Sequence, residues 1–408
     1  MTTPGVADWR VRARRLADQL TAEGDLRTAS WREALVSVPR HEFVPRYYEL
    51  DTGTRPATWT CHEPGDEAGT ARWLERVYSP TTLVTELADY AGRGVQTGVV
   101  SSTKPDLMIR MLEALQVSDG MQVCEIGTGT GYNAALLCHR LGDTHVCSID
   151  IDPSLIAAAR TRLARLGYHP ALIAADGADG SATHAPFDRI IATCAVRAIP
   201  PAWIHQLTPG GLLLVHLEGP LGAGNLLALH RGDGPVLHGR FLPWWGCFMR
   251  RRTTTGPSTG TPPPTRTTQP PTIRRTPLNP AELDGGARFP LLAQLHLPSG
   301  MFHSIRPADD QAPVSYLAAP DGSWCEITRT PDSTGQYPLR EAGPTPIWAA
   351  IENAWTQWTE LGAPAWHDFG LTATPATHHI WHRDPHTGPH WALPTPNETE
   401  SEPGKRGR

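Results

Sequence analysis

The chain has 408 residues, 39% of them hydrophobic, and a formal net charge of -5. This length leaves room for a second domain beside one enzyme core, and the small negative charge gives no support for binding nucleic acid. The seven cysteines lack C-x-x-C spacing, no leader sequence is visible, and no apolar stretch approaches the roughly 18 residues of a membrane span. We therefore expect a soluble, cytoplasmic protein with reduced, buried thiols and no membrane partner.

The first 95 residues are predicted to form a helical segment. A helix rich in Arg and Leu precedes Val36–Pro45, which reads V-S-V-P-R-H-E-F-V-P. Further along, three hydroxyl side chains stand before a Lys-Pro-Asp sequence: Ser101, Ser102 and Thr103. A hydroxyl residue followed by proline is typical of a helix cap with proline in the first turn.

The segment Val123–Asn133, V-C-E-I-G-T-G-T-G-Y-N, predicts a buried strand, a glycine-rich turn and the start of a helix. Dinucleotide-binding turns follow G-x-G-x-x-G, whose third glycine corresponds to Tyr132 here. Glu125 lies two positions before the first glycine, where a carboxylate suits a cationic, amine-bearing ligand such as S-adenosylmethionine. The candidate cofactor residues of this segment are Glu125, Gly127, Thr128, Gly129, Gly131 and Asn133.

The next predicted strand ends in an acidic residue. His145–Asp150 reads H-V-C-S-I-D, and Asp150 stands where a ribose diol is bound in nucleotide-binding α/β folds. Asp152 is the competing carboxylate, although Asp-Pro-Ser is also typical of the cap and first turn of a helix. Asp150 is therefore the preferred ribose ligand.

A third strand, Ala171–Ala175, runs into Asp176 and Gly177. Ligands usually bind at the carboxyl ends of strands in open α/β sheets, so Asp176 is a candidate acceptor for an adenine amino group. The alternative is an ordinary turn aspartate. Two further strands, Phe187–Ala192 and Leu212–Leu217, continue the alternation with helices, which predicts an α/β fold with a doubly wound parallel sheet.

Together, these motifs resemble the protein L-isoaspartate O-methyltransferases. The resemblance rests on Glu125–Asn133, Ala175–Gly177, Leu207–Leu212 and the V-P-R-H-E-F-V-P segment, and it covers roughly residues 8–220. It implies a class I S-adenosylmethionine-dependent methyltransferase fold with its Rossmann-like catalytic domain in residues 96–250. It also implies S-adenosyl-L-methionine as cofactor and a carboxylate as methyl acceptor.

The chain departs from the family's repair enzymes at one motif. Those enzymes carry Ser-x-Pro-His, whose hydroxyl contacts the substrate carboxylate, whereas aligning Pro105 places Thr103 on the serine and Asp106 on the histidine. A hydroxyl cluster before proline resembles the subgroup encoded with ribosomal peptide natural products, graspetides first and lanthipeptides next. The resemblance implies methylation of an aspartate side chain in a precursor peptide, followed by collapse of the ester to an aspartimide. Thr103, with Ser102 and Ser101 as neighbours, is the candidate catalytic group.

Two other functions remain open. One is repair of damaged proteins by methylation of L-isoaspartyl residues, an interpretation that Thr103, Asp106 and the added carboxy-terminal domain weaken. The other is a noncatalytic subunit that binds the precursor, which the intact Glu125, glycines and Asp150 argue against. The sequence does not indicate an oligomeric state.

The composition changes after the core. Residues 251–280 are rich in Thr and Pro and are predicted to be a linker. Residues 281–395 are predicted to form an α+β accessory domain for substrate recognition, and residues 396–408 a disordered tail. The expected elements of the accessory domain are strands at Phe289–Leu297, Val314–Ala318 and Ser323–Thr328, and a tryptophan-bearing helix at Pro346–Leu361.

Five histidines lie close together near the end of the chain: His378, His379, His382, His386 and His390. Adjacent histidines on a strand point to opposite faces, and the intervening Pro and Gly residues indicate turns. No cysteine or carboxylate array completes a site, so no metal is expected.

Overall fold

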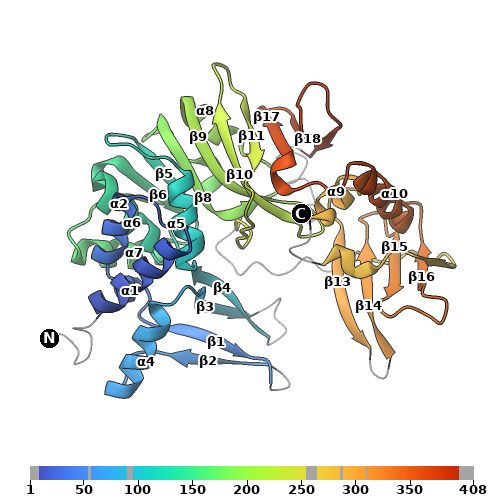
Figure 1. The fold of residues 1–408 in the computed structure, drawn as a ribbon, viewed down its shortest axis with the longest axis horizontal. Helices are drawn as coiled ribbons and strands as arrows, with labels where there is room; N and C mark the ends of the chain where they lie inside the picture. Colours follow the sequence, from blue (N-terminus) through green and yellow to red (C-terminus); the bar gives the residue numbers. More distant parts are fainter. Residues whose placement is uncertain are drawn as a thin grey trace, which may run out of the picture. The chain divides into compact units, whose positions relative to one another are not determined.

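The computed structural model describes residues 9–53, 57–89, 95–253, 264–284, 288–308 and 311–394. Contacts divide the chain into two compact units. The first contains the chain up to Cys194, His205–Val215 and the segment that begins at Phe248; the second contains Ala195–Ile204, His216–Cys247 and the described residues from 264 onward. Figure 1 shows the helices and strands of both units, coloured along the sequence.

The amino-terminal part of the first unit combines helices with a four-stranded sheet. Its helices are α1 (Trp9–Ala22), α2 (Ala29–Ser37), α3 (Arg40–Phe43) and α4 (Glu67–Val77). Its strands are β1 (Tyr47–Asp51), β2 (Thr58–His62), β3 (Leu83–Asp89) and β4 (Gln96–Ser102), in the antiparallel order β2-β1-β3-β4. The prediction of a helical segment was therefore incomplete. Strand β2 is largely exposed and lacks an apolar alternation, so the sequence carries little sign of it.

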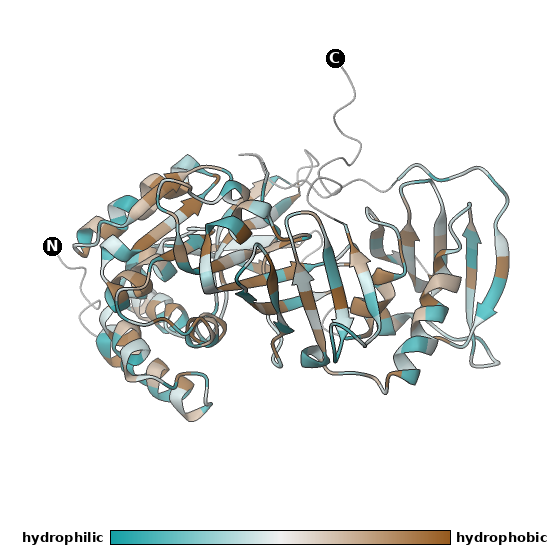
Figure 2. Ribbon diagram, turned by 90° about the horizontal axis from the view of Figure 1, so that it is seen from above, coloured by the Kyte–Doolittle hydropathy of each residue, from teal (hydrophilic) through white to brown (hydrophobic). Residues whose placement is uncertain are grey.

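The predicted doubly wound sheet is present in the first unit. Its parallel strands are β5 (Val123–Ile126), β6 (Val146–Asp150), β7 (Ala171–Ala174) and β8 (Phe187–Val196), in the order β8-β5-β6-β7. Helices α5 (Pro105–Ala114), α6 (Tyr132–Leu141) and α7 (Pro153–Arg165) alternate with them, and α8 (Pro201–Gln206) precedes β9 (Leu207–Glu218). Figure 2 shows both hydrophobic and hydrophilic residues within single helices. This mixture is expected where one face of a helix packs on a buried sheet. The carboxyl ends of β5, β6 and β7 place the glycine turn and the two predicted aspartates on one edge.

The second unit contains two antiparallel arrays. In the first, β10 (Gly224–Arg231), β11 (Leu237–Phe241), β17 (Phe369–Ala373), β18 (His378–His382) and β19 (His390–Leu393) follow one another in space. The second has the order β12 (Thr272–Thr276), β16 (Tyr337–Ala342), β15 (Trp324–Thr328), β14 (Gln311–Ala318) and β13 (Phe302–Ala308). Helix α10 (Ile347–Glu360) matches the predicted tryptophan helix.

The grouping of these strands differs from the predicted domain boundaries. Strand β17 pairs with β11, so the end of the chain returns to strands that precede the predicted linker, and β12 itself lies inside residues 251–280. Such pairing between distant segments leaves no local signal. The linker residues 254–263 and the predicted tail lie outside the described residues.

The predicted strand Phe289–Leu297 is wrong, because this segment forms helix α9 (Phe289–Leu295). Its first side chain packs edge-on against Trp355 of α10, with ring centroids 4.8 Å apart. Short apolar runs are ambiguous between helix and strand, and packing against a neighbouring helix decides this one.

All seven cysteines are free thiols, but Cys61 and Cys247 are exposed, so burial was wrongly expected for these two. None of the described helices is both long and apolar enough to span a bilayer. Within the described ranges, no three His, Cys, Asp or Glu side chains are grouped so that they could hold a metal ion.

Candidate cofactor and acceptor site

The three glycines of the turn after β5 have positive φ angles, 98° at Gly127, 50° at Gly129 and 88° at Gly131. A Cβ atom on Gly127 would lie 2.6 Å from Thr193 Oγ1, and one on Gly131 would lie 2.9 Å from Ala159 Cβ. A Cβ on Gly129 would meet nothing closer than the Ser101 carbonyl oxygen at 4.0 Å. Two glycines are thus required by close packing, whereas Gly129 faces open space that a ligand can enter.

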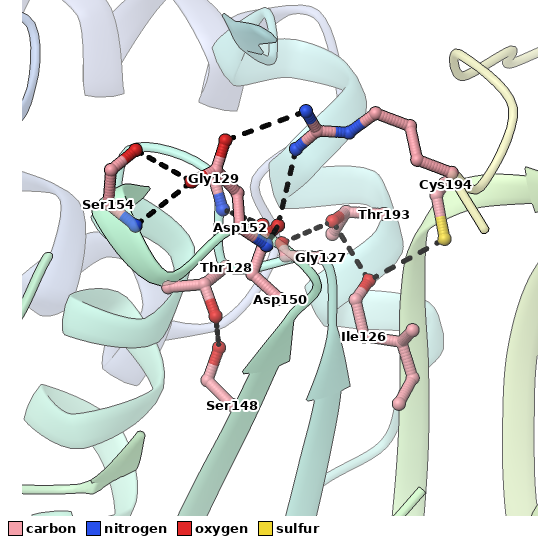
Figure 3. Close-up of polar contacts among 11 residues, drawn as sticks. Ile126, Gly127, Thr128, Gly129, Ser148, Asp150, Asp152, Ser154, Thr193 and Cys194 are labelled. Carbon is pink, nitrogen blue, oxygen red and sulfur yellow. Dashed lines mark hydrogen bonds and ion pairs between the residues drawn. The ribbon is translucent and has the colours of Figure 1, made fainter. Parts of the chain in front are cut away.

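Asp150 ends β6 directly beside this turn and is only 7% exposed. Its Oδ2 accepts a hydrogen bond from Gly129 N at 2.9 Å, and its Oδ1 accepts one from Asp152 N at 3.1 Å (Figure 3). The competing Asp152 caps helix α7, since its Oδ1 accepts from Ser154 N at 2.9 Å. The two aspartates therefore have different surroundings, and only Asp150 is bonded to the glycine turn.

Asp176 and Gly177 follow β7 at the same edge of the sheet. Asp176 Oδ1 accepts from Ala178 N at 2.8 Å and so caps the short 3-10 helix Gly177–Asp179. A Cβ on Gly177 would lie 2.6 Å from Ile126 Cγ2, so this turn packs closely on β5. Asp176 fills the turn role that the sequence left open, and its side chain stays 32% exposed, which leaves an adenine contact as a prediction.

Glu125 is fully buried and joins the turn to the neighbouring strand. It accepts hydrogen bonds from Asn133 Nδ2 at 2.7 Å and from Ser148 Oγ at 2.5 Å. Thr128 Oγ1 lies 2.6 Å from the same Ser148 oxygen. Ser148 thus links Glu125 to Thr128, while Asn133 contacts Glu125 directly. Sequence reasoning missed Ser148, whose signal was a polar residue within the apolar run that precedes Asp150. Here Glu125 stiffens the turn, and its direct contact with a cationic ligand stays a prediction.

Burial raises the pKa of Glu125 from 4.5 to about 7, although Ser148 and Asn133 partly offset the effect. Between these two values the folded state holds a proton that the unfolded state has lost, so this group's contribution to stability falls as pH rises through that window. The melting temperature of wild type minus that of Glu125→Gln is expected to fall between pH 4.5 and 7 and to level off above it. Thermal unfolding scans at a series of pH values measure this difference in melting temperature. A difference that grows with pH would contradict the assignment.

The hydroxyl run lies at the end of β4, next to the glycine turn through the Ser101 carbonyl. Ser102 is 3% exposed and its Oγ accepts from Arg40 Nη2 at 3.3 Å, whereas Ser101 and Thr103 are half-buried. Helix α5 has Lys104 as its N-cap with no side-chain capping bond. The three hydroxyls therefore do not cap this helix, and Ser101 and Thr103 are more accessible than Ser102.

Arg40, from the V-P-R-H-E-F-V-P segment, anchors this region and was missed as a site residue. It is completely buried, and burial lowers its pKa to about 10. Its guanidinium donates to Ser102 Oγ, to the Thr103 carbonyl at 3.1 Å and to three further carbonyls, those of Val77, Ser79 and Thr81. The signature segment thus fixes the backbone that carries Thr103.

Asp106 occupies the position that aligns with the family's histidine. It pairs with Lys104 Nζ at 2.7 Å and with Arg110 Nη2 at 3.2 Å. A carboxylate held by two cations replaces an imidazole here.

Residues 77–232 match the model of the family described as Protein-L-isoaspartate(D-aspartate) O-methyltransferase (PCMT). The protein-L-isoaspartate O-methyltransferase of Pyrobaculum neutrophilum is 30% identical over 225 residues, which cover 54% of this chain and 91% of that protein. The chain belongs to the protein-L-isoaspartate O-methyltransferase family. The chain is also 31% identical over 207 residues to the protein-L-isoaspartate O-methyltransferase of Ignicoccus hospitalis. The aligned residues cover 50% of this chain and 81% of that relative.

A solved chain titled protein-L-isoaspartate O-methyltransferase superposes with a TM-score of 0.52 and 23% identity, covering 90% of this chain and 98% of that one. The fold is thus the class I methyltransferase fold expected from the sequence. Because the match extends well past residue 250, a carboxy-terminal extension does not by itself separate this chain from proteins of that name.

As a member of this family, the present chain is an S-adenosylmethionine-dependent carboxyl O-methyltransferase. Its turn fits this cofactor, since Gly129 faces open space and Asp150 carries acceptor oxygens beside it.

Proposed function

We propose that this methyltransferase esterifies the side-chain carboxylate of an aspartate in a ribosomally synthesised precursor peptide, a graspetide first and a lanthipeptide next. The next backbone nitrogen then attacks the ester carbonyl, methanol leaves, and an aspartimide forms. The observation that carries the proposal is the Ser101–Thr103 segment beside Gly129, with Asp106 in place of the repair enzymes' histidine. The protein is an enzyme, which removes the noncatalytic alternative.

The geometry at the carboxyl ends of the strands supports a specific set of cofactor contacts. Asp150 accepts hydrogen bonds from the ribose hydroxyls, and Asp176 accepts from the adenine amino group. Gly127, Gly129, Gly131 and Gly177 keep side chains out of the turn, while Glu125, Thr128 and Asn133 hold its shape. When bound, S-adenosylmethionine supplies the methyl group.

The acceptor needs positioning more than acid or base catalysis, because an aspartate carboxylate is already ionised near neutral pH. We assign Thr103 Oγ1 as donor to one carboxylate oxygen, which leaves the other oxygen free to attack the methyl group.

Repair of L-isoaspartyl residues is the second candidate, and the names of the relatives favour it. Both functions use the same cofactor and both esterify a carboxylate, so the methyl acceptor distinguishes them. Initial rates with the precursor peptide and with an isoaspartyl peptide of matched length decide between them. Higher kcat/KM for the precursor supports the proposal, and the reverse order supports repair.

Thr103→Ala is expected to lower kcat/KM for the peptide by about tenfold to a hundredfold, because one hydrogen bond to a charged acceptor is lost. Cofactor affinity should stay unchanged. Thr103→Ser keeps the hydroxyl and serves as the matched control, with activity near wild type. Full activity in Thr103→Ala would remove this residue from the catalytic site.

A further inference from the structure

Two consecutive arginines lie against the carboxylates of the cofactor site. Both belong to the segment after Phe248, within the first unit, and both side chains are only 15% exposed. Arg251 Nη1 contacts Asp176 Oδ1. Arg252 Nη2 lies 3.4 Å from Asp150 Oδ1, and its Nη1 lies 3.7 Å from Asp152 Oδ2.

These arginines use the same acceptor atoms that the proposed cofactor contacts need. Asp150 Oδ2 is bonded to Gly129 N, and Oδ1 receives Asp152 N together with the Arg252 guanidinium. Asp176 Oδ1 likewise receives Ala178 N together with Arg251. Each carboxylate oxygen has about two lone pairs. Asp150 Oδ1 and Asp176 Oδ1 therefore already accept two donors each, whereas Asp150 Oδ2 accepts one. Ribose or adenine donors that use the two Oδ1 atoms must replace the guanidinium groups.

We propose that Arg251 and Arg252 form an internal latch that competes with S-adenosylmethionine for Asp150 and Asp176, so that the cofactor binds only when the latch is released. The inference rests on the proposed cofactor roles of these two aspartates. Hydrogen-bonding chemistry supports the exchange, because guanidinium N–H, ribose O–H and adenine N–H groups all donate to carboxylate oxygens. The apparent affinity for the cofactor equals the intrinsic affinity multiplied by the fraction of molecules in which the latch is open.

The first test measures binding by isothermal titration with cofactor-free, full-length protein. Arg251→Ala/Arg252→Ala is expected to bind S-adenosylmethionine and S-adenosylhomocysteine about threefold to tenfold more tightly than wild type, because partly exposed ion pairs are modest competitors. The matched control is Arg15→Ala/Arg32→Ala, which removes two arginines from surface ion pairs with Glu75 and Asp18. Its affinity should equal that of wild type.

The outcomes separate the latch from the proposed site. Weaker binding in the latch double variant would mean that the arginines clamp the bound cofactor, and unchanged binding would mean that they take no part; either result overturns the latch. If Asp150→Ala binds as well as wild type, the proposed cofactor site is wrong, whatever the latch variant does.

A second test uses wild-type protein and tryptic cleavage after Arg251 and Arg252. S-adenosylhomocysteine should accelerate cleavage at these positions, because release from the carboxylates exposes the arginines to the protease. Cleavage after Arg14, an exposed residue of α1, provides the reference rate. Protection of the latch by S-adenosylhomocysteine would contradict competition.

Discussion

Asp150→Ala is expected to weaken binding of S-adenosylmethionine by about tenfold to a hundredfold, the loss that accompanies removal of one charged hydrogen-bond acceptor. The carboxylate lies beside Gly129, and its oxygens hold both Gly129 N and Asp152 N. Part of the loss therefore comes from a looser turn, and part from the missing ribose contact. Isothermal titration measures the affinity.

Two controls distinguish these contributions. Asp143→Ala removes another carboxylate of the same unit that accepts a backbone hydrogen bond, from His169 N at 2.8 Å, and should leave affinity unchanged. Asp150→Asn keeps one acceptor oxygen and should fall between wild type and alanine. Wild-type affinity in Asp150→Ala would exclude this residue as the ribose ligand.

The latch also predicts coupling between Asp150→Ala and Arg252→Ala. If Arg252 acts through Asp150, the gain in affinity from Arg252→Ala should shrink when Asp150 is already alanine, because the competing pair no longer exists. A double-mutant cycle measures the coupling.

Arg40→Met is expected to lower the free energy of unfolding by about 3–5 kcal/mol, because several oxygens are left without a donor at a cost of about 1–3 kcal/mol for each one that is buried. Five acceptors lose their donor: the Ser102 hydroxyl and the carbonyls of Val77, Ser79, Thr81 and Thr103. Burying those oxygens without a partner costs more than the lost guanidinium packing. Denaturant titration measures the change.

Arg40→Lys keeps the charge but offers fewer donors in a different geometry, so it should recover only part of the loss. Arg14→Met changes an exposed arginine of α1 and is the matched control, with stability close to wild type. Wild-type stability in Arg40→Met would contradict the anchoring role, and reduced methyl transfer under folded conditions would support its positioning of Thr103.

The parts of the site that could be predicted from sequence are those encoded locally. The glycine turn and Asp150 lie at the ends of short, fully buried strands, where strand, turn and helix follow one another within a few residues. Helix α10 was predictable for the same reason, because its tryptophans recur at helical spacing.

The missed features all depend on contacts between distant segments. Arg40 meets residues far along the chain, Ser148 meets Glu125 across the sheet, and β17 pairs with β11. Residues 251–280 were predicted to be a linker from their composition, yet two of their arginines contact Asp150 and Asp176, the proposed cofactor ligands. The amino-acid composition of a segment indicates how polar it is on average, but it does not indicate which distant side chains its arginines contact.

Intact-mass analysis of the precursor peptide after incubation with this enzyme and S-adenosylmethionine tests the central claim most directly. The expected result is a mass gain of one methylene unit, as for a methyl ester, followed by loss of methanol to the aspartimide, and neither change without the cofactor. An unmodified precursor, together with methylation of an isoaspartyl peptide by the same preparation, would contradict the proposed acceptor and establish repair instead.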